Sequence, residues 1–304
     1  GSFGGLGGVH SGDGPSQVYG NPSTPQYLGG GGGAGSSGRA GGNGGGRVHI
    51  TLAGAATVDG FITANGAAGD WFQSGGGAGG SIWFDVDRIE GTGSITANGG
   101  GDEVGGGGGR VLVVYGAVGA AGNDLDGLLN VHAFGGRGNS ANGSAGTVVL
   151  RQRAQAHGTL VIDDGRTETA SQRTPLTPIT FGVVQALSAD TLALDTLTPV
   201  VPNGLVGLRI NPNTAQEAEY TILSNTGAAV TVDIAGRPAL TDVAQPGDTC
   251  VGVYRFDEVL LRRGGHLVAG DRLHAADTIS LTDYGVITHF DATADYESHL
   301  ELFA

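Results

Sequence analysis

The pentapeptide Ile-Thr-Ala-Asn-Gly occurs twice in the chain, at residues 62–66 and 95–99. In both places it closes a longer unit that opens with a glycine cluster and a β-type run. The opening run reads Gly-Gly-Arg-Val-His-Ile at residues 45–50 and Gly-Gly-Ser-Ile-Trp-Phe at residues 79–84. The sequence therefore contains a repeated unit of two short strands joined to a glycine-rich segment.

Two further copies of this unit follow. The third opens at residues 108–113 and continues at residues 129–133, and a degraded fourth pairs residues 146–150 with residues 158–162. Aligned on their first strands, the copies begin at Val48, Ile82, Val111 and Val148, which are 34, 29 and 37 residues apart. A period in the thirties with two strands per copy predicts a β-solenoid, in which each coil stacks on the next.

The first strand of each copy alternates as a half-buried strand does. In the second copy the alternation places Ile82, Phe84 and Val86 on one face, and Ser81, Trp83, Asp85 and Asp87 on the other. Stacked in register, the outer face carries a column of His49, Trp83, Leu112 and Val149. This column becomes apolar along the stack, so we expect it to be covered, and we expect the glycine runs to be the cover.

Glycine is concentrated in the first half of the chain. Of 61 glycines, 48 lie in residues 1–150. Glycine runs are often flexible linkers. The alternative is packed extended chain of polyproline-II-like form, because segments without Cβ atoms can approach closely enough for their backbones to hydrogen-bond. Recurrence of the runs at one phase of the repeat favours the packed alternative.

Composition divides the chain into three parts. Residues 1–165 carry the glycine-rich repeats, and residues 166–255 have short strands separated by Pro, Asn and Gly turns, which predict a small β-barrel or β-sandwich-like insert. The repeat style returns in residues 256–304 as a continuation of the solenoid or a C-terminal cap. We therefore predict an all-β protein, a glycine-rich β-solenoid with a small inserted or capping β domain.

Charge and cysteine content limit the classes of partner. The net charge is −14, there is no Lys, and the longest apolar stretch is too short to span a bilayer. Nucleic acid and anionic membranes reward dense basic surfaces, so we expect neither as a partner, and no transmembrane segment. The single Cys250 cannot form an intrachain disulfide and is expected to be a small buried residue. The absence of Met suits an extracellular location, because Met is an oxidation target.

The Gly-Gly-Gly-Arg-Val, Gly-Gly-Ser-Ile-Trp and Ile-Thr-Ala-Asn-Gly pattern of residues 29–165 resembles glycine-rich β-solenoid modules of very large secreted or surface-attached bacterial proteins. Residues 205–254 look like a small β-barrel insert of bacterial surface and phage fibre proteins. These resemblances imply adhesion or the building of a surface filament. They carry no catalytic motif that could be transferred to this chain.

Three weak candidate sites stand out. Asp85 and Asp87 share the outer face with Trp83 and could be a solvated surface, a calcium site or an acid–base pair. Asp124 and Asp126 lie in an Asn-Asp-Leu-Asp-Gly segment with partial likeness to a calcium loop, although turn chemistry alone explains such residues.

The third candidate is the aromatic pair Trp71 and Phe72, which could stack on a sugar ring or fill the core of an adjacent coil. Trp83 is a further weak ligand-binding candidate. Asp163 and Asp164 form a fainter calcium candidate still. Zinc spacings, phosphate loops and the Gly-x-Ser-x-Gly nucleophile motif are absent from the sequence.

We therefore predict a structural or adhesive segment of an extracellular bacterial surface protein or filament, with no catalytic residues and no cofactor beyond the calcium just considered. Its expected partners are neighbouring modules or identical copies, with surface glycans as a further option. The alternative function is a glycan-binding or glycan-cleaving β-helix of the phage-fibre or tailspike type.

Overall fold

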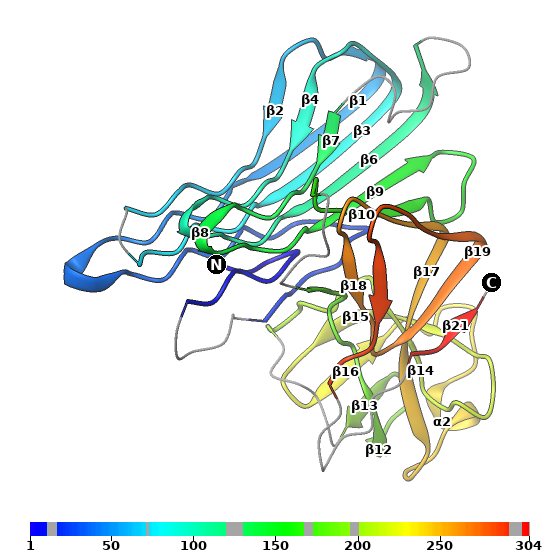
Figure 1. Cartoon of the computed structure of the whole chain (residues 1–304). Helices are drawn as coiled ribbons and strands as arrows, with labels where there is room; N and C mark the ends of the chain where they lie inside the picture. Colours follow the sequence, from blue (N-terminus) through cyan, green and yellow to red (C-terminus); the bar gives the residue numbers. More distant parts are fainter. Residues whose placement is uncertain are drawn as a thin grey trace.

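The computed structural model describes residues 1–10, 17–70, 73–119, 130–166, 173–194, 201–291 and 300–303, and the described fold is all-β, as predicted (Figure 1). The strands of the first half are β1 (Arg47–Thr57), β2 (Phe61–Thr63), β3 (Ser81–Glu90), β4 (Ser94–Thr96), β5 (Asp102–Val104), β6 (Arg110–Val118), β7 (Asn130–His132), β8 (Gly138–Ala141) and β9 (Thr147–Gln152). Those of the second half are β10 (Thr159–Asp163), β11 (Thr174–Pro175), β12 (Phe181–Leu187), β13 (Thr191–Leu194), β14 (Arg209–Asn211), β15 (Tyr220–Asn225), β16 (Ala229–Val232), β17 (Thr249–Arg262), β18 (His266–Val268), β19 (Arg272–Leu281), β20 (Val286–Thr288) and β21 (Leu302–Phe303). The short helical turns η1 (Ser36–Gly38) and α2 (Leu240–Val243) complete the described elements.

The first strands of the four repeats lie side by side. β1, β3, β6 and β9 pair in parallel, and Val48, Ile82, Val111 and Val148 stand opposite one another, as the sequence alignment predicted. The second strands, β2, β4 and β7, form a separate parallel sheet in the same order. The repeat thus sets the register of both sheets.

A core lies between these two sheets. Ile82, Phe84 and Val86 of β3 are buried, and they belong to one cluster with Ile95 of β4 and Val131 of β7. The predicted inner face is therefore confirmed.

The fourth copy does not repeat the strand arrangement of the first three, so that part of the prediction is wrong. After β9 the chain turns back, and β10 pairs antiparallel with β9 in the same sheet instead of joining β7. The turn brings Gly158 into the left-handed region (φ 83°), where its N–H and that of His157 donate to Asp257. Strand alternation is the same in either direction, which is why the sequence pattern did not distinguish a hairpin from a coil.

From β10 onward a second set of parallel pairings begins. β10, β17, β19 and β21 pair in parallel, and β11, β18 and β20 form a second small parallel sheet. Strands β12, β13, β16, β15 and β14 pair antiparallel in that order, and both β12 and β14 pair with β17, so the pairings close on themselves. The boundary predicted at residues 255 and 256 falls inside β17, which takes part in both arrangements.

The glycine runs are packed segments and not linkers. In Figure 1 they extend the β1, β3 and β6 stack toward the lower left, around the N-terminus. Their backbones hydrogen-bond to one another: Gly106 donates to the carbonyl of Gly100 at 2.8 Å, and Gly143 donates to Gly136 at 3.0 Å. A Cβ added at Gly108 would lie 1.9 Å from the carbonyl oxygen of Ala133, so no other residue fits there without movement of the backbone.

Parts of the chain other than the glycine runs cover the outer column. The expectation from the sequence that the glycine runs would cover it is therefore wrong. Leu112 and Val149 are buried in one cluster with Leu160, Ile179 and Tyr254 of the second half. The glycine runs continue the strands lengthwise, so the face of the sheet is left to the C-terminal half.

The N-terminal segment covers the outer face nearer to the glycine runs. Arg110, fully buried at the start of β6, lies over the ring of Phe3 and donates to the carbonyl of Tyr19 and to the hydroxyls of Thr147 and Thr177. Its burial lowers the pKa of the guanidinium to about 10.

Candidate functional site

Trp83 lies in the outer column of β3, between His49 and Leu112 in register. Its ring stacks on that of His49 with centroids 4.9 Å apart, and it packs against the core cluster shared with the C-terminal half. The indole Nε1 is buried and has no hydrogen-bond partner among the described residues. The ring is therefore largely engaged within the protein.

Asp85 and Asp87 lie close enough for a single guanidinium to contact both. Arg153, just after β9, places Nη2 2.6 Å from Asp85 and 3.1 Å from Asp87. The pair is partly neutralised, and a cation at this place would compete with Arg153.

The remaining predicted ligands lie outside the described residues. Trp71 and Phe72 are not described, and neither are Asp124 and Asp126. Within the described ranges, no group of three or more His, Cys, Asp or Glu side chains is placed to hold a metal ion. The calcium and sugar-stacking hypotheses at these four positions stay predictions.

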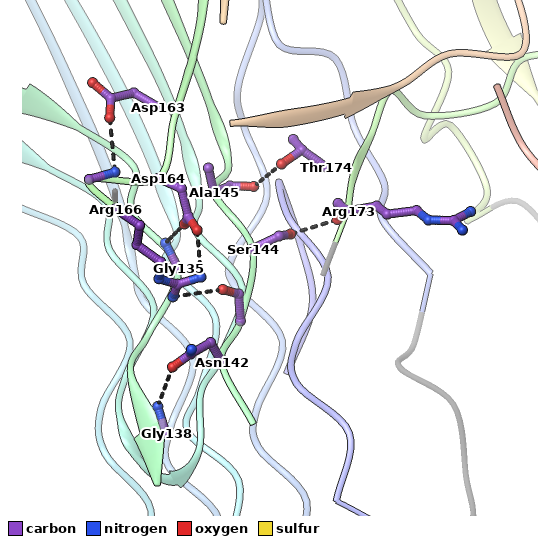
Figure 2. A network of polar contacts seen from close by, with 12 residues as sticks. Gly135, Gly138, Asn142, Ser144, Ala145, Asp163, Asp164, Arg166, Arg173 and Thr174 are labelled. Carbon is purple, nitrogen blue, oxygen red and sulfur yellow. Dashed lines mark hydrogen bonds and ion pairs between the residues drawn. The ribbon is translucent and has the colours of Figure 1, made fainter. Parts of the chain in front are cut away.

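Asp163 and Asp164 are part of a polar joint between the glycine-rich segments and the second half (Figure 2). Asp163 pairs with Arg262 at 2.7 Å and with Arg263. Asp164, buried after β10, pairs with Arg166 at 2.5 Å.

The same joint ties the glycine-rich backbone to this buried pair. The N–H of Gly135 donates to Asp164, and Arg166 donates to the carbonyl of Gly143. Burial raises the pKa of Asp164 to about 7 despite the charge of Arg166. Both carboxylates already pair with arginines, so a cation at this place would compete with Arg166, Arg262 and Arg263.

Strand β1 forms a free edge of the stack. It pairs with β3 on one side, and among the described strands none pairs with its other side. Its side chains are mostly exposed, with Ile50 36% and Leu52 42% accessible, and Phe61 on the neighbouring β2 is 84% accessible. The sheet of β1 and the sheet of β2 thus both end at the first copy of the repeat, with apolar side chains in solvent.

A pocket of about 260 Å³ was not foreseen from the sequence. It lies where β9, the β9–β10 turn, β14, β17 and the N-terminal segment meet, and its lining residues are Asn21, Ser23, Arg151, Ala156, His157, Gly207, Leu208, Arg209, Val253, Tyr254, Arg255 and Phe256. Three of the 15 basic residues line it, and none of the acidic residues does. No sequence signal marks this cluster, because its arginines are up to about a hundred residues apart.

The arginines of the pocket differ in their partners. Glu219, a buried residue just before β15, accepts from Arg255 at 2.5 and 2.9 Å and lies 3.5 Å from Arg209. Burial alone would raise the pKa of Glu219, but the hydrogen bonds and charge of Arg255, with the charge of Arg209, bring it below the usual value. Arg151 has no ion-pair or hydrogen-bond partner among the described residues.

The pKa of His157 reflects the burial and the charges inside the pocket. Burial lowers its pKa, and the positive charges of Arg209, Arg255 and Arg151 lower it further, against the opposing effect of Asp257. The imidazole is therefore biased toward its neutral form, and the positive charge of the pocket resides on the arginines.

Comparison with models of known families, with curated proteins and with solved structures finds no match for this chain. Its function therefore has to be argued from its own residues. In the described ranges, no helix is both long enough and apolar enough to cross a bilayer.

Proposed function

We propose that the chain is a structural or adhesive segment of an extracellular bacterial surface protein or filament. In this proposal the stacked repeats form a β-solenoid whose glycine runs adopt polyglycine-II-like packing. Strands β12 to β17 form a small β-barrel inserted into it. The parallel in-register pairing of β1, β3, β6 and β9 supports the solenoid, and the closed cycle of antiparallel pairings supports the barrel.

The free edge at β1 is the observation that carries this function. An unpaired strand edge is a template for pairing with another chain, and proteins that stay monomeric blunt such edges with Lys, Pro or bulges. The described part of β1 has no Pro and no Lys, and its only Arg is Arg47, at the first position. A bulge lies between Leu52 and Ala55, but Ile50 and Leu52 before it remain exposed. A coil from a neighbouring module or an identical copy could extend both sheets at once.

Association of the purified chain tests this proposal. Light scattering and electron microscopy over a rising concentration series are expected to show ordered end-to-end assembly. The double variant Leu52→Lys, Phe61→Lys is expected to remain monomeric, because two charges at the edge oppose strand addition. Leu223→Lys is the matched control, since Leu223 is an exposed leucine (54% accessible) of β15, away from this edge.

Two outcomes would contradict the proposal. One is a chain that stays monomeric at every concentration reached. The other is assembly that Leu223→Lys disrupts as strongly as the edge variant does.

The alternative, a glycan-binding or glycan-cleaving β-helix, is favoured by the arginine-lined pocket. A glycan array combined with a hydrolase and lyase screen on the isolated chain separates the two functions. Loss of glycan binding in Arg151→Gln, with no assembly of the wild-type chain, would favour the alternative.

A further inference from the structure

The chain is strongly acidic, so a pocket lined by three arginines and no carboxylate calls for a specific explanation. Arg151 comes from β9, Arg209 from β14 and Arg255 from β17. Gathering like charges is unfavourable unless something offsets the repulsion. Glu219 offsets part of it for Arg209 and Arg255, and Arg151 remains without a partner among the described residues.

The shape and lining of the pocket restrict what it can hold. Its volume of about 260 Å³ is below the range of about 300–1,000 Å³ that is typical of sites for drug-sized ligands. The buried Tyr254 and Phe256 contribute apolar surface, while Asn21 and Ser23 add neutral hydrogen-bonding groups. Gly207, at a φ of 82°, lets the N-terminal turn approach, since a Cβ there would lie 3.1 Å from the amide nitrogen of Asn21. The site has room for one small group.

The guanidinium groups that line the pocket indicate that the bound group carries a negative charge. Arginine presents a planar fork of donors that matches carboxylate or phosphate oxygens, and such charge-assisted bonds are about twice as strong as neutral ones. Arg151, Arg209 and Arg255 are each only partly exposed, so their charges are less screened by salt than those of surface arginines.

We propose that this pocket binds the oxyanion of a small acidic ligand, either the carboxylate of an acidic sugar or inorganic phosphate. Arg151 is the primary contact, because the other two guanidinium groups are shared with Glu219. The pocket is separate from the free edge at β1. Absence of oxyanion binding would therefore leave the proposed assembly intact, and absence of assembly would leave the proposed oxyanion binding intact.

Calorimetric titration at low salt tests the proposal, with the full chain kept below the concentration at which it assembles. The probes are glucuronate, glucose as the matched neutral sugar, and inorganic phosphate. Saturable binding of glucuronate or phosphate is expected, and none of glucose. Binding of glucuronate tighter than phosphate assigns the site to an acidic sugar, while equal or tighter binding of phosphate assigns it to the free ion.

Variants assign the binding to the pocket. Arg151→Gln is expected to weaken binding by roughly tenfold or more, the usual cost of losing a charged hydrogen bond. Arg88→Gln removes the same charge from an exposed position on β3 and is expected to leave the affinity within about twofold. Arg209→Gln serves as a second pocket variant, and equal melting temperatures of the variants confirm that they fold.

The proposal is overturned if neither glucuronate nor phosphate shows saturable binding. It is equally overturned if both pocket variants fold and bind as the wild type does.

Discussion

In the glycine-rich segments of the first half, neighbouring backbones lie so close that they hydrogen-bond with no room for side chains. In the second half, they are held apart by buried apolar residues. A Cβ at Gly108 would meet a backbone oxygen at 1.9 Å, whereas Leu192, Leu261 and Leu273 are fully buried within a side-chain core. The same chain is therefore stabilised in one region by the absence of side chains and in the other by their volume.

The largest expected effect comes from adding one methyl group to the glycine layer. Gly108→Ala is expected to destabilise the first half by about 3 kcal/mol or more, at or above the upper end of the usual cost of overpacking, because the clash is with backbone that cannot rotate away. Gly46→Ala is the matched control, since a Cβ at Gly46 would have no atom within 4 Å. Denaturant unfolding measures both, and equal losses for the two variants would show that the glycines are not packed as described.

The second half is expected to respond to the opposite change. Leu273→Ala removes a fully buried side chain of β19 and should cost about 2–5 kcal/mol, as cavities in cores do. Leu223→Ala, at an exposed position of β15, should cost less than about 0.5 kcal/mol. Denaturant unfolding again gives the values, and a small loss for Leu273→Ala would mean that side-chain volume does not hold this half together.

The smallest expected effect is a pH dependence contributed by both regions. Burial raises the pKa of Asp164 to about 7, and it raises that of Asp271 to about 7 although three backbone N–H groups donate to this carboxylate. A carboxyl that holds its proton more tightly when folded stabilises the protein below its unfolded pKa. This stability is lost as the pH rises through the folded value.

Each of these two carboxyls should therefore lower the stability by about 1 kcal/mol per pH unit as the pH rises toward 7. His157 and His274, whose pKa values are lowered, act in the opposite sense, so the comparison is between the wild type and Asp271→Asn. Denaturation midpoints between pH 5 and 8 should fall less steeply in the variant, whatever its baseline stability. Parallel curves would show that Asp271 does not titrate in this range.

Much of the first half could be predicted from sequence because the copies of the repeat can be aligned with one another by their pattern of residues. Val48, Ile82, Val111 and Val148 were aligned by pattern, and they stand opposite one another in the sheet. A repeated pattern of apolar residues leaves little freedom in register, because a slip of one residue would turn the buried side chains outward. The all-β class followed from the same pattern.

The features that escaped prediction depend on contacts between distant segments. The direction of β10 is not encoded in its alternation, which fits a hairpin and a coil equally well. The cover over Leu112 and Val149 comes from the second half, which the local pattern of β6 and β9 cannot reveal. The pocket gathers Arg151, Arg209 and Arg255 only once the chain has folded.

The hairpin between β9 and β10 has a consequence for polarity. Strands on the β1 side of it run one way and strands on the β19 side run the other. Among the described strands, β1 and β21 are the last at the two ends of this arrangement, and they run in opposite directions. In an array built by simple translation, every joint between copies would pair antiparallel strands, as β9 and β10 already do within the chain. The molecule thus joins two sets of parallel strands that run in opposite directions, and a row of copies would have no overall direction along its strands.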